Sequence, residues 1–381
     1  MNHKKILRIF IFLSFITILG SKVVNALPNQ TYLVDVEFIE KDNNTLDDDL
    51  YKKLEPLLTE LFTQRNQAIL SFDSNSLRKY YNLNQKPSLY AFENEAKKIK
   101  YLGNWSEKQG ITFSDIKSKV KLKKIRKKET NIYSTIAVVS TEFHYSYDND
   151  EDKKNNMFRL GTYHYLNLKL EDEGFIITKE WYTNPFADSL NLNNLKSEEI
   201  KTYINNKKAP ELVLTDRVKK AIAYAHKYCG AAANVEEGFN YNNKYTDFNP
   251  AGGDCANFAS QILFEGGNFR KNNTWNYIDG TGSVAWVNAQ GFKNYMLESG
   301  RASLIAKGKY QQIYKAAYNL RPGDFVAYEK KGRITHISTV TGLDSKGYPL
   351  VTCHNTDRYN VPWDLGWSDK NMTFWLVRVH Y

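Results

Sequence analysis

The chain has few cysteines, only Cys229, Cys255 and Cys353 among its 381 residues. A disulfide-stapled scaffold needs several cysteine pairs in a much shorter chain, so that class of protein is excluded. Three thiols cannot all pair within one molecule, and at least one stays free. Cys229 and Cys353 lie in apolar surroundings, at a helix end and in a strand, and we expect both to be core residues.

Long hydrophobic runs are also missing. The apolar segment 9–19 is too short for a transmembrane helix, which needs about 20 residues. It follows a basic stretch and precedes the small-residue cleavage pattern Val24-Asn25-Ala26, so residues 1–26 are interpreted as a signal peptide. We therefore predict a secreted, extracellular protein that can associate with a cell wall and has no membrane span after cleavage.

The sequence contains no phosphate loop, dinucleotide fingerprint or metal-ligand spacing. Asp148, Asp150 and Asp152 resemble the start of a calcium loop, but Lys153 and Arg159 stand where glycine and glutamate are required. We interpret residues 148–156 as a solvated hairpin tip and predict neither a metal nor a cofactor.

Acidic residues are outnumbered, and the formal net charge is +10. Beyond the N-terminal segment, most of the excess lies in residues 211–381, which favours an anionic wall polymer as a partner. Nucleic acid fits an exported chain poorly. The basic run 117–128 alternates with apolar residues and is interpreted as an edge strand protected by lysines.

Residues 27–195 are predicted to form an α+β domain. Apolar periodicity indicates helices at 46–71, 76–81 and 89–102, with Pro56 inside the first. Alternation then indicates antiparallel strands at 120–122, 132–147, 157–170 and 174–182. Helices followed by a long antiparallel sheet resemble the rolls of the nuclear-transport-factor-like type, a resemblance of architecture that implies no activity.

A polar connector, residues 196–212, leads to a second predicted domain, residues 213–381. Helices are predicted from Asp216, which Thr215 caps, from Cys255, and over 283–300. Antiparallel strands are predicted at 325–328, 334–340, 350–354 and 374–379. The fold class is therefore α+β, with a cysteine-bearing helix packed on an antiparallel sheet in the second domain.

The most informative stretch is Gly252-Gly253-Asp254-Cys255-Ala256-Asn257-Phe258. It places a cysteine at the first turn of a helix, where unpaired N–H groups and the helix dipole stabilise the reactive thiolate. His336 and then His354-Asn355-Thr356-Asp357 follow. Cysteine, histidine and a polar orienting residue is the chain order of papain-like hydrolases.

Together with Gly266-Gly267 and Pro322-Gly323-Asp324, these motifs make residues 213–381 resemble the bacterial "putative amidase domain" family. The family is similar to CHAP-type cell-wall amidases, and the resemblance implies a papain-like fold and a Cys/His amidase activity.

Within that interpretation Cys255 is the nucleophile and His336 the general base. His354 is the preferred orienting residue and Asn355 the next. Asp254 is expected to cap the helix. Substrate-binding candidates are Asn257, Gln261 and Trp286, although helix capping and core packing are also consistent with them.

The predicted function is that of an exported cysteine amidase or peptidase that hydrolyses an amide bond in a peptide or peptidoglycan-like substrate through a Cys255 thioester. The alternative is a non-catalytic protein that binds a wall polymer or another partner on the same scaffold. Transfer of the acyl group to an amine, in place of hydrolysis, also remains open.

Overall fold

The computed structural model describes residues 45–186, 195–233, 239–367 and 371–381, which belong to one compact unit, Thr45–Tyr381. The predicted signal peptide lies outside the described residues. Within those ranges, no helix is both long enough and apolar enough to cross a bilayer.

The described part of the chain begins with the helices predicted from its apolar periodicity: α1 (Thr45–Leu70), the short 3₁₀-helix η1 (Asn75–Tyr80) and α2 (Lys86–Gln109). Pro56 lies inside α1. The second long helix is longer than predicted and ends at Gly110, whose φ of 69° suits glycine and whose N–H bonds the carbonyls of Ser106 and Glu107.

Four antiparallel strands follow: β1 (Ile111–Glu129), β2 (Ile132–Tyr147), β3 (Asn156–Glu171) and β4 (Gly174–Tyr182). The predictions for β2, β3 and β4 are confirmed within a residue at each end. The predicted strand 120–122 is only the centre of β1, because the lysines of β1 hide its apolar alternation.

The second half contains the helices α3 (Ser197–Asn205), α4 (Asp216–Lys227), η4 (Asn249–Ala251), α5 (Cys255–Gln261), η5 (Ile262–Gly266), α6 (Val284–Val287), α7 (Ala289–Glu298) and α8 (Tyr310–Ala317). Helix α3 lies within the predicted connector and buries Ile200 and Ile204. The predicted helix 283–300 is interrupted at Asn288, whose side chain caps α7.

The strands of the second half are β5 (Tyr277–Ile278), β6 (Thr281–Gly282), β7 (Ala302–Gly308), β8 (Phe325–Lys330), β9 (Arg333–Leu343), β10 (Pro349–Cys353), β11 (Asp357–Pro362) and β12 (Met372–Val379). The sequence did not indicate β7, β11 or α8.

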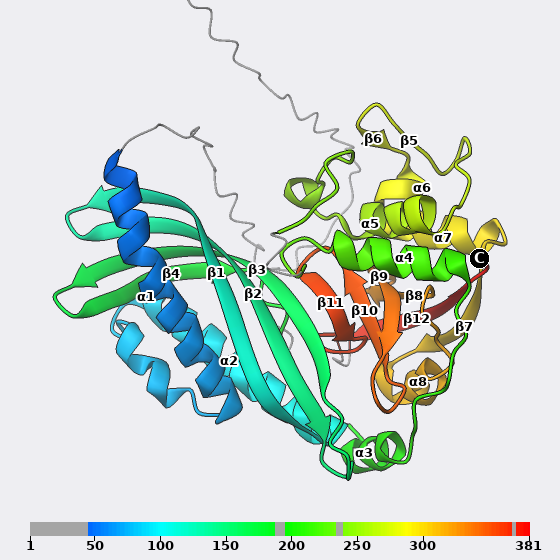
Figure 1. Cartoon of the computed structure of the whole chain (residues 1–381), viewed down its shortest axis with the longest axis horizontal. Helices are drawn as coiled ribbons and strands as arrows, with labels where there is room; N and C mark the ends of the chain where they lie inside the picture. Colours follow the sequence, from blue (N-terminus) through cyan, green and yellow to red (C-terminus); the bar gives the residue numbers. More distant parts are fainter. Residues whose placement is uncertain (1–44, 187–194, 234–238, 368–370) are drawn as a thin grey trace, which may run out of the picture. The chain divides into compact units, whose positions relative to one another are not determined.

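Ten strands form one sheet in the order β1-β2-β3-β11-β10-β9-β8-β12-β7, with β4 on β3 (Figure 1). Neighbouring strands pair antiparallel, which confirms the α+β class. The pairing of β3 with β11, from Asp357 opposite Gly161 to Tyr359 opposite Arg159, joins strands of the two predicted domains. Separate folding of residues 27–195 and 213–381 stays a prediction.

The two faces of the second-half sheet carry different cores. Ala327, Ile337 and Val377 pack with Cys255 in one apolar cluster. Their strand neighbours Val326 and Leu376 belong to another cluster, which includes residues of α8 and of the first half. This alternation decides which site residues can meet.

Candidate active site

Cys255 is the first residue of α5, and all seven residues of this helix are buried. The side chain is 7% exposed and packs in the cluster of Ile337. Burial raises the pKa of the thiol to about 12, although the backbone N–H groups of Ile337 and Ala256 act in the opposite direction. In this arrangement Cys255 is a neutral thiol at neutral pH.

Asp254 stands at the N-cap position but does not cap the helix with its side chain, so the capping prediction is wrong. Its Oδ1 accepts hydrogen bonds from the Asn257 amide, at 2.8 Å, and from the Phe248 backbone N–H, at 3.1 Å. Its Oδ2 accepts a hydrogen bond from Nδ1 of His354 at 2.6 Å. The carboxylate therefore ties the start of α5 to the residue that follows β10.

His354 is buried and lies over the first turn of α5. Its ring stacks on Phe258, with 3.8 Å between the centroids. Nδ1 donates to Asp254 and Nε2 donates to the Tyr228 carbonyl at 2.8 Å, so both nitrogens carry a proton. Burial lowers the pKa of His354, but the bond to Asp254 and the nearby carboxylates outweigh it and the net pKa is raised. The ring is an imidazolium.

Asn355 fixes the turn between β10 and β11. It adopts a φ of 67°, and its side-chain oxygen accepts the backbone N–H of Asp254. Gly253, at φ +143°, allows this approach, because a Cβ there would lie 3.2 Å from the Asn355 amide. The predicted site residues His354 and Asn355 are thus both brought to the start of α5.

Asp357 and Tyr241 extend this group. Asp357, like His354 and Asn355, was a candidate for the orienting residue, whereas Tyr241 was given no catalytic role. The Asp357 carboxylate accepts hydrogen bonds from the Tyr241 hydroxyl and from the Ala231 backbone N–H, the latter at 2.8 Å. Burial raises the pKa of Asp357, while His354 acts to lower it. The sequence signal for Asp357 was its place in the polar run 354–358 that follows β10.

His336 lies on the other face of the sheet. Its ring contacts Tyr328 and Trp367, with centroid separations of 5.4 and 4.9 Å, and its Nε2 is 3.2 Å from Sγ of Cys353. Ile337, the next residue, faces Cys255. Within the described residues, no hydrogen bond joins Cys255 to either histidine. The structure therefore brings His354, and not His336, to the first turn of α5, where it stacks on Phe258. Phe258 and Cys255 belong to different apolar clusters.

The pair of His336 and Cys353 is electrically neutral. Burial, and then the nearby Arg358, lower the pKa of His336 to about 3. Burial raises the pKa of Cys353 to about 11. A buried neutral imidazole beside a buried neutral thiol is not poised for nucleophilic attack.

The predicted substrate-binding residues are buried and have partners inside the protein. The Asn257 amide donates to the Thr246 carbonyl, and its oxygen accepts the Trp286 indole N–H at 2.9 Å. Gln261 accepts the Tyr224 hydroxyl at 2.9 Å. Contact of these side chains with a substrate would require the start of α5 to open.

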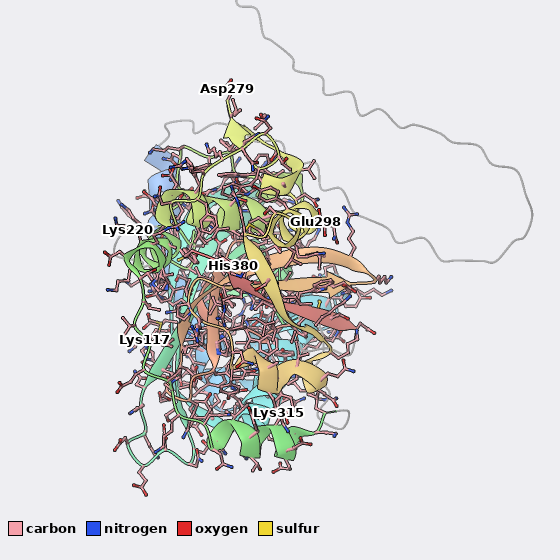
Figure 2. The ribbon with its side chains drawn as sticks, turned by 90° about the vertical axis from the view of Figure 1, so that its right-hand side faces the viewer. Lys117, Lys220, Asp279, Glu298, Lys315 and His380 are labelled. Atoms are coloured by element: carbon pink, nitrogen blue, oxygen red, sulfur yellow. The ribbon has the colours of Figure 1, made fainter. Side chains whose placement is uncertain are left out.

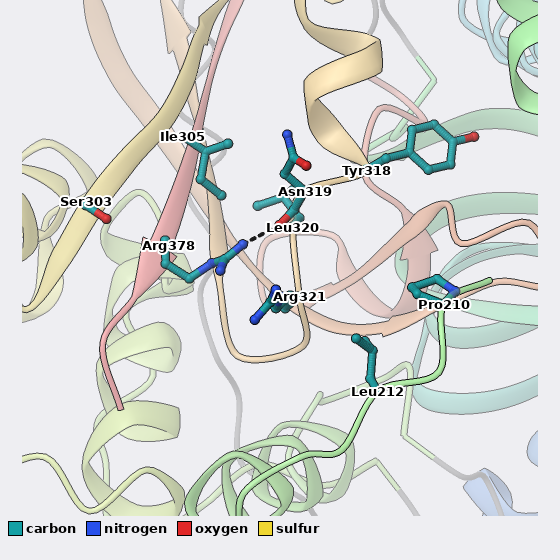
Figure 3. A pocket seen from close by; sticks show the side chains of 9 residues that line it. All are labelled: Pro210, Leu212, Ser303, Ile305, Tyr318, Asn319, Leu320, Arg321 and Arg378. Atoms are coloured by element: carbon teal, nitrogen blue, oxygen red, sulfur yellow. Dashed lines mark hydrogen bonds between the residues drawn. The ribbon is translucent and has the colours of Figure 1, made fainter. Parts of the chain in front are cut away.

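A pocket of about 510 Å³ lies elsewhere, lined by Pro210, Leu212, Ser303, Ile305, Tyr318, Asn319, Leu320, Arg321 and Arg378 (Figure 3). Arg378 donates to the backbone carbonyl of Asn319 and, at 2.9 Å, to Asp324. Its β12 neighbours Val377 and Val379 pack in the cluster of Cys255. The pocket includes none of the predicted site residues.

In the ranges that the structure describes, no group of three or more His, Cys, Asp or Glu side chains could hold a metal ion. The chemistry available at the start of α5 is that of the Cys255 thiol, the charged imidazole of His354 and the carboxylates of Asp254 and Asp357.

Residues 215–377 match the model of the family described as "Putative amidase domain". The resemblance drawn from the motifs is thereby confirmed for this segment, and the family suggests amide hydrolysis. No curated protein matches the chain. A solved structure described as a function unknown protein from Mycobacterium tuberculosis matches with 6% identity and a TM-score of 0.23, over 42% of this chain and 90% of that one. A TM-score of 0.23 is too low to indicate a shared fold.

Proposed function

We propose that the chain is an exported cysteine amidase that hydrolyses an amide bond in a peptidoglycan-like wall polymer, with Cys255 as the nucleophile. The observation that carries the proposal is the position of Cys255 at the start of α5, in a segment that matches an amidase family, beside the hydrogen-bonded pair of Asp254 and His354.

The residue best placed to act as the base is His354. Asp254 would hold its Nδ1–H, leaving Nε2 to exchange a proton, as the acidic member of a catalytic triad does. Because His354 is doubly protonated and its Nε2 now donates to the Tyr228 carbonyl, Nε2 has to leave that oxygen, give its proton to water and turn towards Cys255 before it can act as a base. His336 then has a structural role beside Cys353.

The proposed reaction has two halves. The deprotonated Nε2 of His354 takes the proton of the Cys255 thiol, and Sγ attacks the amide carbon to give a tetrahedral oxyanion, which the N–H groups at the start of α5 can stabilise. The C–N bond breaks as Nε2–H of His354 protonates the leaving amine. Water then attacks the thioester carbon while Nε2 of His354 takes one of its protons. The C–S bond breaks, and Nε2–H returns that proton to Sγ, which releases the acid and the free thiol.

Replacing single residues tests the assignment, with turnover followed by mass analysis of purified wall incubated with the protein. Cys255→Ala should lower turnover by about 10³-fold or more, and His354→Gln by about 10²–10⁴-fold. His336→Gln is the matched control and should cost less than about tenfold. If His336→Gln abolishes turnover and His354→Gln does not, the base is His336 and the proposed geometry is wrong.

The second candidate is a non-catalytic binding protein, which the low exposure and raised pKa of Cys255 favour. Alkylation by iodoacetamide near neutral pH separates the two. A catalytic Cys255 should react faster than Cys229 and Cys353, and His354→Gln should slow that reaction. Equal and slow alkylation of all three thiols, with no products from wall, would favour the binding protein.

A further inference from the structure

The strands of the first half present a face with a regular composition. Directly paired residues of antiparallel strands point to the same side. Lys124, Ile136, Tyr165 and Trp181 pair in turn and form one row across β1 to β4. One adjacent row begins with Lys121 and contains Tyr163. The other adjacent row begins with Arg126. We call Lys121, Lys124, Arg126, Tyr163, Tyr165 and Trp181 the platform.

The aromatic residues of the platform are open to solvent. Trp181 is 58% exposed, Tyr165 39% and Tyr163 38%. The rings of Tyr165 and Trp181 lie side by side, with 5.5 Å between their centroids. The opposite face of the same strands is buried, since His164 and Tyr182 are core residues. Neighbouring exposed rings on a sheet that already has its core indicate a binding surface.

The edge of the platform is strongly basic. Eight of the twelve residues from Lys117 to Lys128 are Lys or Arg, and β1 is the end strand of the sheet. The three rows contain no acidic residue. Burial lowers the pKa of Lys123, and repulsion from the neighbouring Lys121 lowers it further. An anionic ligand would relieve this repulsion.

Both ends of the platform are defined. At one end Gly161 packs so closely on the backbone of Ala231 that a Cβ there would lie 2.5 Å from it. At the other end the next row, which includes Ile132 and Ile176, lines a groove of about 580 Å³. The open surface thus runs from a covered end to a groove whose lining includes Glu171, so an anionic chain would be held on the platform itself.

We propose that the platform binds an anionic glycan, whose sugar rings stack on Tyr165 and Trp181 while its carboxylate or phosphate groups pair with the cations of β1. Single-stranded nucleic acid offers the same two chemistries, because bases also stack on exposed rings. The choice of a glycan rests on the proposed function, since the polymer that carries the amide substrate would be retained by this face.

The test measures binding by the full chain carrying Cys255→Ala, so that loss of hydrolysis cannot alter the outcome. Polygalacturonate is the anionic probe, amylose the neutral one and oligothymidylate the nucleic-acid one. Polygalacturonate should bind best, with an affinity that falls as salt rises. Tyr165→Ala with Trp181→Ala, and Lys121→Glu with Lys124→Glu, should each weaken it by about tenfold.

Lys219→Glu with Lys220→Glu on α4 makes the same change of charge away from β1 and should alter the affinity less than twofold (Figure 2 labels Lys220, and Lys117 on β1). An equal loss with this control, equal binding of amylose, tighter binding of oligothymidylate, or no binding of any probe would each overturn the proposal. None of these outcomes depends on whether Cys255 is catalytic.

Discussion

Replacing Lys108 by methionine should destabilise both halves of the molecule. Lys108 belongs to α2 and is fully buried, and its ammonium donates to Asp364 at 2.6 Å and to the Tyr310 hydroxyl at 2.7 Å. Asp364 also accepts hydrogen bonds from Tyr348 and Trp105. Both partners of the ion pair are 0% exposed, and the pair joins the first half of the chain to the turn before β12.

The magnitude follows from what Lys108→Met leaves behind. Methionine has a similar length, so the cavity term is small, and the cost is that of a buried carboxylate without its cation. Removing one member of a buried pair costs about 3–5 kcal/mol. That is a large fraction of the roughly 5–15 kcal/mol that stabilises an ordinary domain. Lys108→Met with Asp364→Asn removes both charges and should recover part of the loss.

Urea unfolding followed by circular dichroism and tryptophan fluorescence measures the effect. The exposed Lys100 lies on the same helix, and Lys100→Met is the matched control, with an expected change below about 0.5 kcal/mol. We expect one shared transition that shifts in Lys108→Met. A cost below about 1 kcal/mol, or a second-half transition that does not move, would refute the reasoning and support separate folding of the halves.

Two further predictions concern pH and packing. The free energy of unfolding should fall as pH drops below about 6.5. Burial is the main cause that lowers the pKa of His336, to about 3, and the pKa of His164. The unfolded chain therefore binds protons that the folded chain cannot. His336→Gln should reduce this acid loss in urea titrations at pH 5 and 7, and an unchanged pH dependence would contradict it. Gly161→Ala should cost about 1–3 kcal/mol in thermal or urea unfolding, because its Cβ would meet the backbone of Ala231 at 2.5 Å. Gly342→Ala, where the nearest atom lies at 3.5 Å, should cost much less, and equal costs would show that the close approach is not the cause.

The sequence predicted most of the long helices and strands, because their apolar periods are regular. It missed β11, whose sequence Asp-Arg-Tyr-Asn-Val-Pro has no apolar alternation, and reduced β1 to residues 120–122 because lysines alternate along it. Helix α3 was not predicted, because only Ile200 and Ile204 of its nine residues are buried and the apolar period is correspondingly weak. Pairing partners far apart in sequence, such as β3 and β11, leave no local signal.

In the site, the sequence identified the start of α5 and the polar run that contacts it. It did not place His336, because a strand residue changes face with a shift of one position. We expected His336 to share a face with Ile334. The register shift between Tyr328 and Glu329 instead puts Ile334 with Ile337 in the cluster of Cys255. Side-chain partners such as Asp254 and His354 depend on that register.

Strand β3 connects the platform to the strand that follows the His354 turn. It carries Tyr163 and Tyr165, and four residues earlier in the chain it pairs through Arg159 with Tyr359 of β11. The pairing begins at Asp357, three residues after His354. The strand that carries the tyrosines of the platform is therefore hydrogen-bonded to the strand that follows the His354 turn, and a displacement of β3 along its axis would reach that turn through this ladder.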